Sequence, residues 1–408
     1  MKILHIATGF SISFPGGVTN YVRTLMKSQR SMGHQVDVLG GVGSAAQNKG
    51  DFADNVFDFD GVASVFSLSV DRDDRSKAAW LHQLISSYDL VHFHMSYGFP
   101  ASFYENDIRV PYVVSLHDYG YICPRVFMVN KWGDTCNTRP MATCQSCVGK
   151  LEQINVLRAG SNRMNITLPT IRSRGVNRRA ARLDRFLGGA AERLAVSSRV
   201  AAIFDDAVPG LSCKVLHIGN DSAGPIPQRE QWIASGKIRC CYIGTLNKDK
   251  GAEVFIELVK ALPADRFEFA FWGRGESKYV TALQELGVAV NGAYTPDKLK
   301  GILREVDIGL VLPVWNDNGP QVLMEFINNG VPVLGTSMGG VPDFLNDQTG
   351  YLFDPFKEIE NAVKWLKNID AAALQRMHAN IRPLKTPDQH AREMVAVYES
   401  VAATDRPR

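Results

Sequence analysis

The chain has 408 residues, of which 45% are hydrophobic and 21% are charged, and its formal net charge at pH 7 is +3. This length exceeds what one core usually organises, the composition is that of an ordinary globular protein, and the small net charge argues against a protein built around nucleic acid. No uncharged apolar run approaches the roughly 20 residues of a membrane helix, and the strand-like start lacks the apolar region of a secretory signal, so we expect a cytoplasmic protein of two domains.

The first half of the chain alternates strand-like runs with helical patterns, which is typical of a parallel sheet covered by helices. We predict a first domain over residues 1–222, with a helix from about Val18 to Met32. Its predicted strands are Lys2–Thr8, Val36–Gly40, Leu90–Phe93, Tyr112–Leu116, Arg193–Val196 and Val215–Ile218.

Two glycines, Gly16 and Gly17, lie in the loop between the first strand and this helix. Paired glycines let a backbone approach a phosphate closely, although a flexible turn would use the same residues. The dinucleotide fingerprint G-x-G-x-x-G is absent here, which argues against a nicotinamide enzyme.

His117 and Asp118 directly follow the predicted strand Tyr112–Leu116, at the edge where ligands of parallel sheets bind. An imidazole there can donate a hydrogen bond to a phosphate or to a sugar hydroxyl, and Asp118 can orient the ring. His92 and His94 lie on one face of the preceding strand. Without a convincing third ligand, we interpret this pair as packed or polar side chains rather than as a metal site.

Four cysteines lie in one insertion, at about residues 121–149, with the spacing C-x12-C-x7-C-x2-C. They are Cys123, Cys136, Cys144 and Cys147. Four thiolates with a terminal CxxC can bind zinc tetrahedrally, and a reducing cytosol disfavours disulfides. Such a zinc would be structural, since four thiolates leave no open coordination position. Free thiols or a redox pair are the alternatives.

A basic stretch follows between Lys150 and Arg193, with ten lysines and arginines against three acids. Such an excess is typical of a solvated helix face, or of a surface that attracts anionic membrane lipids or a lipid-diphosphate acceptor. No recognition module for nucleic acid accompanies it.

The turn-rich segment Gly219–Lys237 is the predicted linker to a second domain, residues 223–387, and Asp388–Val401 reads as a closing amphipathic helix. The predicted strands of the second sheet are Ile238–Ile243, Phe267–Trp272, Val288–Val290, Ile308–Leu312 and Val331–Leu334. The predicted fold class is α/β, with two Rossmann-like domains whose ligands bind at the carboxyl ends of the strands.

Two glycine-containing segments follow strands of this second sheet. The first, Gly244–Gly251, reads GTLNKDKG and includes Lys250, which in isolation would be a solvated loop lysine. The second is the turn Gly273–Gly275, which contains Arg274.

A short helix is predicted after the strand Ile308–Leu312, with Asn318 as its N-cap and Pro320 in its first turn. The unpaired N–H groups at such a helix start, near Gln321–Leu323, favour an anion. The carboxylates of Asp317 and Glu325 flank this position and can accept hydrogen bonds from hydroxyl groups. A sugar nucleotide, with its phosphates and hydroxyls, suits the arrangement.

The two acids Asp317 and Glu325, the run Gly330–Val333 and the turn Gly339–Asp343 together resemble the signature of glycosyltransferase family 4, whose members are retaining enzymes of the GT-B fold. Other landmarks of the family occur in the same order, so the resemblance covers nearly the whole chain. It implies an acceptor-binding first domain, a nucleotide-sugar-binding second domain facing it across a cleft, and a last helix, residues 388–408, that packs back on the first domain.

The resemblance also assigns roles to individual residues. It places the His117–Asp118 pair against the transferred sugar, Lys250 on the diphosphate and Glu325 on the ribose hydroxyls. The assigned donor-binding residues are Gly16, Gly17, Gly244, Thr245, Gly273, Gly275, Gln321, Val322, Leu323 and Glu325. The assigned catalytic residues are His117, Lys250, Asp317 and Glu325.

Two positions depart from the family pattern. Thr245 stands where the family has an arginine, and Asp317 stands where it has a glutamate that holds the donor sugar. Lys248 or Arg274 would be needed to replace the missing cation, and the shorter carboxylate would change the choice of sugar or shift its loop.

The implied reaction moves a sugar from a nucleoside-diphosphate sugar to a hydroxyl of a glycan or lipid-linked acceptor, with retained configuration and no redox cofactor. Bacterial family members commonly build cell-surface polysaccharides, and this context favours a peripheral contact of the basic stretch with the inner face of the cell membrane. Some members carry a similar cysteine cluster. The alternatives are a GT-B epimerase of sugar nucleotides and a non-catalytic, sugar-nucleotide-binding subunit of a transferase complex. A redox or zinc-hydrolase interpretation, based on the CxxC alone, explains little else.

Overall fold

The computed structural model describes residues 1–404, except residues 15, 48–50, 62–71, 165, 167 and 230. Residue 15 of the predicted glycine loop, residues 165 and 167 of the basic stretch and residue 230 of the predicted linker therefore lie outside the described part. The chain divides into two compact units, residues 1–218 with 387–408, and residues 219–386. The predicted domain limits at residues 222 and 387 differ from these by a few residues.

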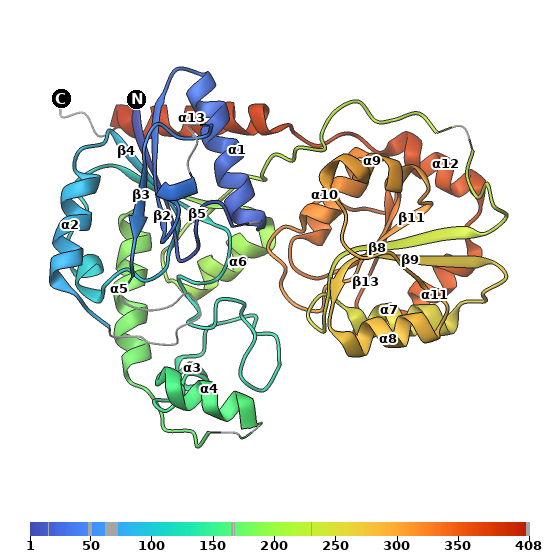
Figure 1. The fold of residues 1–408 in the computed structure, drawn as a ribbon, viewed down its shortest axis with the longest axis horizontal. Helices are drawn as coiled ribbons and strands as arrows, with labels where there is room; N and C mark the ends of the chain where they lie inside the picture. The colour runs from blue at the N-terminus through green and yellow to red at the C-terminus, as the bar shows by residue number, and fades with distance from the viewer. Residues whose placement is uncertain are drawn as a thin grey trace. The chain divides into compact units, whose positions relative to one another are not determined.

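Unit 1 is built on a seven-stranded parallel sheet in the order β3-β2-β1-β4-β5-β6-β7 (Figure 1). Its strands are β1 (Lys2–Thr8), β2 (Gln35–Gly41), β3 (Val56–Phe59), β4 (Leu90–Ser96), β5 (Tyr112–Leu116), β6 (Glu192–Ala195) and β7 (Lys214–Val215). Its α-helices are α1 (Gly17–Ser31), α2 (Arg75–Ile85), α3 (Met141–Cys147), α4 (Asn155–Met164), α5 (Gly175–Gly189), α6 (Ser198–Ala207) and α13 (Pro387–Thr404), and its short 3-10 helices are η1 (Ala45–Gln47) and η2 (Ala101–Glu105).

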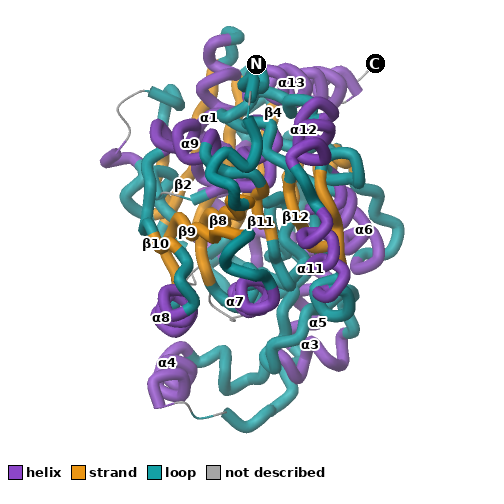
Figure 2. The backbone as a smooth tube through the Cα atoms, turned by 90° about the vertical axis from the view of Figure 1, so that its right-hand side faces the viewer, coloured by secondary structure: helices purple, strands orange, loops and turns teal. Residues whose placement is uncertain are grey.

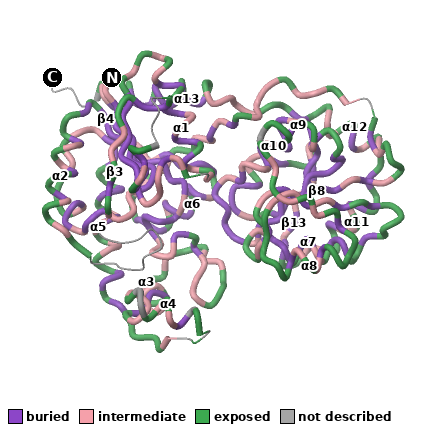
Figure 3. Tube along the Cα trace, in the orientation of Figure 1, coloured by how far each residue is buried: buried purple, intermediate pink, exposed green. Residues whose placement is uncertain are grey.

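The central strands of unit 1 are apolar along nearly their whole length, because helices cover both faces of the sheet. In β1 every residue after Lys2 is buried, and β4 is buried from Leu90 to Met95. Figure 3 shows this burial concentrated on the strands, with exposed residues on the outer helices. Three of the few polar side chains in this interior are His5, His92 and His94.

The last helix, α13, packs against α1 of the same unit, so residues from the two ends of the chain share one core (Figure 1). Tyr398 of α13 is fully buried, and Ser28 of α1 donates a hydrogen bond to Asp388 at 2.6 Å. Unit 1 is therefore discontinuous in sequence.

Unit 2 contains a six-stranded parallel sheet in the order β10-β9-β8-β11-β12-β13. Figure 2 shows β10, β9, β8, β11 and β12 side by side in this order. The strands are β8 (Ile238–Leu246), β9 (Phe267–Gly275), β10 (Ala289–Val290), β11 (Ile308–Val311), β12 (Val333–Thr336) and β13 (Gly350–Phe353). The α-helices are α7 (Ala252–Ala261), α8 (Ser277–Glu285), α9 (Pro296–Arg304), α10 (Gln321–Asn328), α11 (Ile359–Asn368) and α12 (Ala371–Asn380), and Val341–Asp343 forms a 3-10 turn, η3.

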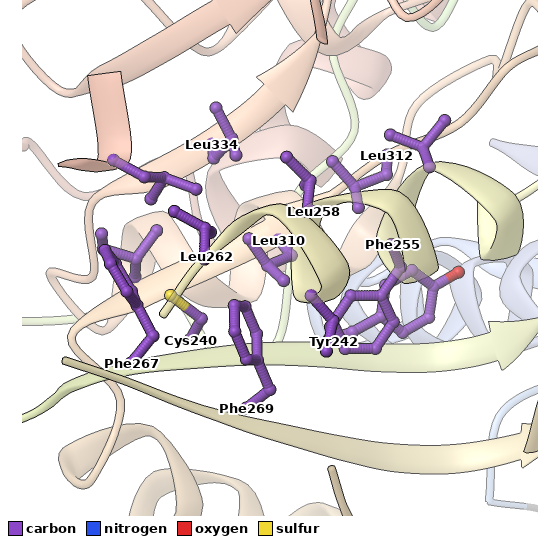
Figure 4. Packing of buried hydrophobic residues seen from close by; sticks show 14 of the residues in the cluster. Cys240, Tyr242, Phe255, Leu258, Leu262, Phe267, Phe269, Leu310, Leu312 and Leu334 are labelled. Atoms are coloured by element: carbon purple, nitrogen blue, oxygen red, sulfur yellow. The ribbon is translucent and has the colours of Figure 1, made fainter. Parts of the chain in front are cut away.

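Alternation along β8 and β9 divides the core of unit 2 between the two faces of its sheet. On one face Cys240 and Tyr242 of β8 pack with residues of α7, as Figure 4 shows. On the other face Cys241 and Ile243 pack with Leu323 of α10 and other residues of α9 and α10. The helix that follows β11 therefore sits directly over the central strands.

The structure differs from the predicted elements mostly at edges and strand ends. Two strands were not predicted, β3 and β13, because both have four residues and lie at sheet edges, where the apolar pattern is weak. β12 begins two residues later than predicted, after Pro332, which has no N–H to donate to a ladder. β7 has two residues rather than four.

No helix of the described residues is long and apolar enough to cross a membrane.

Candidate functional site

Two predicted catalytic residues of unit 2 meet at the carboxyl edge of its sheet. Lys250, in the loop after β8, places its Nζ 2.5 Å from Oδ2 of Asp317, in the loop after β11. The Lys250 side chain is about one third exposed and also lies over the ring of Trp315, 5.4 Å from its centroid. The partly exposed ammonium of Lys250 can exchange the Asp317 carboxylate for a phosphate.

Close backbone contacts hold these two loops in place. Gly251 has a φ of +85°, and a Cβ there would lie 1.8 Å from the carbonyl oxygen of Leu312. Gly339 has a φ of +56°, and its Cβ would lie 2.1 Å from the carbonyl oxygen of Asp317. Only glycine fits at either position, so both glycines serve the placement of the Lys250–Asp317 pair.

The predicted turn Gly273–Gly275 is the end of strand β9, which corrects the prediction. In the segment Gly244–Gly251, residues 244–246 likewise belong to β8, and residues 247–251 form the turn that follows it. Gly244 pairs with Gly273 across the two strands, and Gly275 is also in β9. A Cβ at Gly273 would lie 1.8 Å from the carbonyl oxygen of Gly244, so the two backbones approach more closely than side chains allow. A Cβ at Gly244 itself would lie 3.7 Å from Val322 of α10. The end of β8 at Gly244 therefore lies beside the first turn of α10, as a donor site would require.

Strand pairing shows which cation lies beside Thr245, the position where the family pattern has an arginine. Thr245 is in register with Arg274 on the neighbouring strand, and both residues are exposed. Registered residues of a parallel pair point to the same face, and Ile243 and Trp272, two residues earlier, face the cluster that includes α10. Arg274 thus lies next to the position where the family pattern has an arginine.

The start of α10 differs from the prediction. Pro320, not Asn318, is the N-cap residue, and it makes no side-chain capping bond. The Leu323 N–H donates to the carbonyl oxygen of Pro320 at 3.0 Å, so this donor is used within the helix and not by an anion. Gln321 and Val322 are the first two helical residues and are partly exposed.

Glu325 lies in the second turn of α10, and its carboxyl group is unusual. Its Oε2 is buried and has no hydrogen-bond partner among the described residues. Burial raises the pKa of Glu325 to about 7. A buried carboxylate oxygen without a donor is unfavourable, so this group is suited to a ligand that supplies hydroxyl donors.

Sequence reasoning missed a neighbour of this carboxyl group, Tyr294. Burial raises the pKa of Tyr294, and the negative charge of Glu325 raises it further, so the phenol is neutral and close to Glu325. No motif marks Tyr294 in the sequence, because its position depends on the packing of the segment before α9 against α10.

In unit 1, His117 ends a line of buried imidazoles. His117 follows β5, its side chain is 9% exposed, and its Nε2 lies 3.0 Å from Nδ1 of His94. His94 Nε2 lies 2.9 Å from Nδ1 of His5, so rings from three strand segments form one chain. Burial, with a smaller contribution from the positive charge of His390, lowers the pKa of His117 to about 3.

The third histidine that the sequence did not reveal near His92 and His94 is therefore His5 of β1. Ligand atoms of these three residues lie within 4.8 Å of one another, as a metal site would need. Both ring nitrogens of each histidine, however, already lie within hydrogen-bond distance of a protein atom. The geometry fits a hydrogen-bonded chain, as the interpretation of packed polar side chains predicts.

Asp118, the residue after His117 in the sequence, borders a pocket. Its carboxylate accepts hydrogen bonds from Tyr97 Oη at 2.6 Å and from the Gly120 N–H at 2.7 Å. Burial raises the pKa of Asp118. Asp118 therefore supports Tyr97 and the turn at Gly120. The pocket is lined by Met95, Ser96, Tyr97, Tyr104, Asp118, Gly120, Tyr121, Arg179 and Leu183.

Arg179 of α5 is the cation of this pocket, and the sequence analysis counted it only as part of the basic stretch. Its guanidinium donates to the carbonyl oxygen of Gly120 and, at 3.5 Å, to that of Tyr121. Within the described part of the chain it forms no ion pair with a carboxylate. The neighbouring Arg178 is exposed. The basic stretch thus contains exposed side chains, such as Arg178, and also Arg179, which lines the pocket.

Gly16 and Gly17 lie at the start of α1, also in unit 1. Gly16 is the N-cap residue in an extended conformation, and Gly17 is the first helical residue. The Asn20 N–H donates to the Gly16 carbonyl oxygen at 2.9 Å, as in an ordinary first turn. The predicted role of this pair at a phosphate stays a prediction.

The four cysteines of the insertion gather loosely. Burial raises the pKa of Cys144 to about 11, with further contributions from the charges of Cys123, Cys147 and Cys136. Among the described residues no three of these sulfurs lie within 4.8 Å of one another, and Arg125 Nε donates to Cys147 Sγ at 3.1 Å. All are free thiols. Their spacing is wider than that of a zinc cage.

The predicted site residues thus form two groups. In unit 2, Lys250 contacts Asp317, Gly244 contacts Val322, and Glu325 lies on the same helix. In unit 1, His117 joins a histidine chain and lies in sequence beside the pocket residue Asp118.

Family models match both units. Residues 16–204 match the model described as glycosyl transferase 4-like domain. Residues 237–368 match the model described as glycosyl transferases group 1.

Curated proteins with similar sequences match over part of their length. The chain is 28% identical over 161 residues to D-inositol 3-phosphate glycosyltransferase of Corynebacterium glutamicum, which is 36% of this chain and 38% of that protein. It is 25% identical over 178 residues to the putative teichuronic acid biosynthesis glycosyltransferase TuaC of Bacillus subtilis, 42% of this chain and 45% of that protein. A match to sulfoquinovosyl transferase SQD2 of Arabidopsis thaliana is 25% identical over 136 residues, 31% of this chain and 26% of that protein. Each match spans less than half of the relative.

Solved structures share the fold over the whole chain. Sucrose-phosphate synthase from Thermosynechococcus elongatus superposes with a TM-score of 0.67 at 13% identity, over 99% of this chain and 100% of that one. HepE from Anabaena, in complex with UDP, superposes with a TM-score of 0.58 at 16% identity, over 99% of each chain.

Proposed function

The chain belongs to the glycosyltransferases of the GT-B fold, with a 4-like domain followed by a group 1 domain, and on this premise we propose that it transfers a sugar from a nucleoside-diphosphate sugar to a hydroxyl group with retained configuration. The proposed acceptor is a glycan or a lipid-linked saccharide, and the proposed context is bacterial cell-surface polysaccharide biosynthesis. TuaC, to which part of the chain is similar, is named for teichuronic acid biosynthesis.

The observation that carries the proposal is the buried Oε2 of Glu325, which has no hydrogen-bond partner in the part of the chain that the structure describes. The two hydroxyls of a ribose are donors that match a carboxylate, and a buried acceptor gains most from them because no water competes. HepE, which shares the fold, was solved with UDP and with UDP-glucose. These facts support a nucleotide as the ligand of unit 2.

Lys250 is the proposed partner of the donor diphosphate. Its ammonium is partly exposed and pairs with Asp317. A diphosphate, which accepts stronger charge-assisted hydrogen bonds, can displace this carboxylate. Asp317 is then released to accept hydrogen bonds from the donor sugar. Arg274 adds a second cation on the face of β8 and β9 that points to α10. Cations preorganised around a departing diphosphate stabilise the charge that develops on it.

The pocket beside Asp118 is the proposed place for part of the acceptor. Tyr97, Tyr104 and Tyr121 supply ring faces and neutral hydroxyls, because burial raises the pKa of each phenol. Aromatic faces with a few fixed polar groups are typical of saccharide sites. Among the described residues, the hydrogen-bond partners of the Arg179 guanidinium are carbonyl oxygens, so this cation favours an acceptor that carries negative charge.

The decisive experiment is a transfer assay guided by donor binding. UDP-, GDP- and dTDP-sugars are first screened by thermal shift, because a cognate donor stabilises the folded protein by mass action. The best donor is then incubated with glycan and lipid-linked acceptors, and the anomeric configuration of the product is read by NMR. We expect a product that keeps the donor configuration, and we expect Lys250→Ala to abolish its formation without loss of the fold.

The control is Lys260→Ala, which removes an exposed lysine from the end of α7. It should transfer sugar at the normal rate. Near-normal rates for Lys250→Ala would remove the proposed diphosphate site. Donor binding without transfer to any acceptor would favour a non-catalytic subunit, and epimerised donor formed without acceptor would favour an epimerase.

Zinc binding by the four cysteines, and lipid binding by the basic stretch, stay predictions. A zinc ion would have to draw the sulfurs together and release Cys147 from Arg125. Zinc analysis of protein purified under reducing conditions tests the first, and co-sedimentation with anionic liposomes tests the second.

A further inference from the structure

Five side chains connect the C-terminal helix to His117 through hydrogen bonds inside unit 1. Gln29 of α1 lies at one end of the imidazole chain, with its Oε1 2.8 Å from His5 Nε2. The Gln29 Nε2 donates to the Tyr398 hydroxyl of α13 at 3.3 Å. From His5 the chain continues through His94 to His117. All five side chains are at most 9% exposed.

The direction of the Gln29 amide determines where each proton lies. An amide oxygen only accepts, so His5 carries its proton on Nε2 and its Nδ1 is an acceptor. His94 must then donate from Nε2 to His5, which leaves His94 Nδ1 as an acceptor. His117 must donate from its Nε2 to that atom, so the ring of His117 keeps Nδ1 as its acceptor. A single amide thus sets three tautomers in sequence.

The same direction extends along a second branch through Tyr398. The Tyr398 oxygen accepts from Gln29, so its own proton points to His92 Nδ1, 2.5 Å away. His92 then carries its proton on Nε2, which lies 2.8 Å from Ser115 Oγ. Every contact along both branches therefore joins one donor to one acceptor, and reversing the Gln29 amide would require every proton to move.

The rings are neutral, as this assignment requires. Burial lowers the pKa of His5 to about 4, although its bond to Gln29 opposes the change. Burial, together with the positive charges of neighbouring histidines, holds the pKa values of His92 and His94 well below their usual range. A proton added to any ring would turn an acceptor into a donor and break the chain.

We propose that Gln29, held by Tyr398, is a positioning residue that fixes His117 as the Nε2–H tautomer through His5 and His94. His117 then contributes an acceptor, Nδ1, to its surroundings. An acceptor at this atom suits a hydroxyl group and not a phosphate, which has no proton to donate at neutral pH. The catalytic meaning of the tautomer rests on the proposed function, whereas the tautomer itself does not.

The test is the 15N spectrum of the imidazoles in the full chain, without substrate. His117 is assigned by the signal that disappears in His117→Asn. We expect a protonated Nε2 and an unprotonated Nδ1 in the wild type. Gln29→Leu removes the acceptor of the His5 proton and should move the His117 proton to Nδ1. Gln29→Glu keeps an acceptor toward His5 and should retain the Nε2–H form.

Tyr398→Phe provides the same test with the loss of one oxygen atom, in case Gln29→Leu does not fold. Without the hydroxyl the Gln29 amide is no longer held, so signals of both tautomers are expected. A wild-type His117 protonated at Nδ1, or an unchanged Nε2–H form in both Gln29→Leu and Tyr398→Phe, would overturn the proposal. In an established transfer assay Gln29→Leu should lower kcat roughly 10- to 100-fold with little change in donor KM, the size expected for an orienting partner. Absence of any transfer would contradict the proposed function and leave the 15N result unaffected.

Discussion

Among single residues, Glu325 of the proposed donor site has a buried carboxyl group that weakens the fold at neutral pH. Its pKa of about 7 in the folded protein lies above the ordinary value of 4.5, because burial disfavours the charged form. The folded state therefore binds more protons than the unfolded state between these two pH values. The free energy of unfolding therefore falls as pH rises from 4.5 to about 7. Above this range the loss of stability is complete and amounts to at most about 3 kcal/mol.

We predict that Glu325→Gln is more stable relative to the wild type at pH 8 than at pH 5, while it loses sugar transfer. A glutamine has the same shape but carries no charge to desolvate. The measurement is the free energy of unfolding in urea at the two pH values. Glu257→Gln, at an exposed position of α7, is the control and should show no such dependence. An equal difference at both pH values would show that Glu325 is not desolvated.

At the scale of elements, the pairing of β8 with β9 places Arg274 beside Thr245, the position that departs from the family motif. Thr245 and Arg274 come from segments about thirty residues apart, and only the strand register makes them neighbours. The close approach of Gly244 and Gly273 continues the pairing to this point. A cation lost at one strand position can thus be supplied from the adjacent strand.

We predict that Arg274→Ala lowers kcat/KM for the donor by about 100-fold, the size expected for one charge that stabilises a developing anion. Adding Thr245→Arg to this variant should restore part of the activity, because it places an arginine on the same face. Steady-state kinetics of the two variants provide the measurement. Arg304→Ala, an exposed arginine of α9, is the matched control. Unchanged kinetics for Arg274→Ala would exclude the residue from the donor site.

For the whole molecule, the discontinuity of unit 1 makes its fold depend on the end of the chain. α13 contributes several buried side chains to the core of unit 1, namely Ala391, Met394, Val395, Val397, Tyr398 and Val401. Each large apolar side chain that is removed from water contributes about 1.5–3 kcal/mol, and the net stability of a domain is only about 5–15 kcal/mol. Loss of the helix therefore exceeds what unit 1 can tolerate.

We predict that a chain ending at Thr386 lacks a cooperatively folded unit 1 while unit 2 remains folded. Limited proteolysis should degrade residues 1–218 and leave a protected fragment within residues 219–386. Glu399→Ala, an exposed position of α13, should preserve both units. Equal protection of unit 1 with and without α13 would show that the helix is dispensable for the fold.

The sequence by itself determined most of the parallel strands and the order of the functional loops. Apolar runs such as Lys2–Thr8 and Tyr112–Leu116 report burial locally, so their bounds agree with the structure. The spacing of Asp317 and Glu325 is likewise a property of one short segment. Local patterns fail at short edge strands, such as β3, and at Asn318, where Pro320 takes the capping position.

Only the tertiary structure decided which distant side chains meet. The chain from Gln29 through His5 and His94 joins a helix to two strands, and its order follows from the parallel register of β1 with β4. The burial of Glu325 depends equally on packing around α10, which no spacing in the sequence reports. The periodicity of apolar residues indicates which face of a segment is buried. A contact between two strands depends instead on their register and on the fold of the chain that connects them.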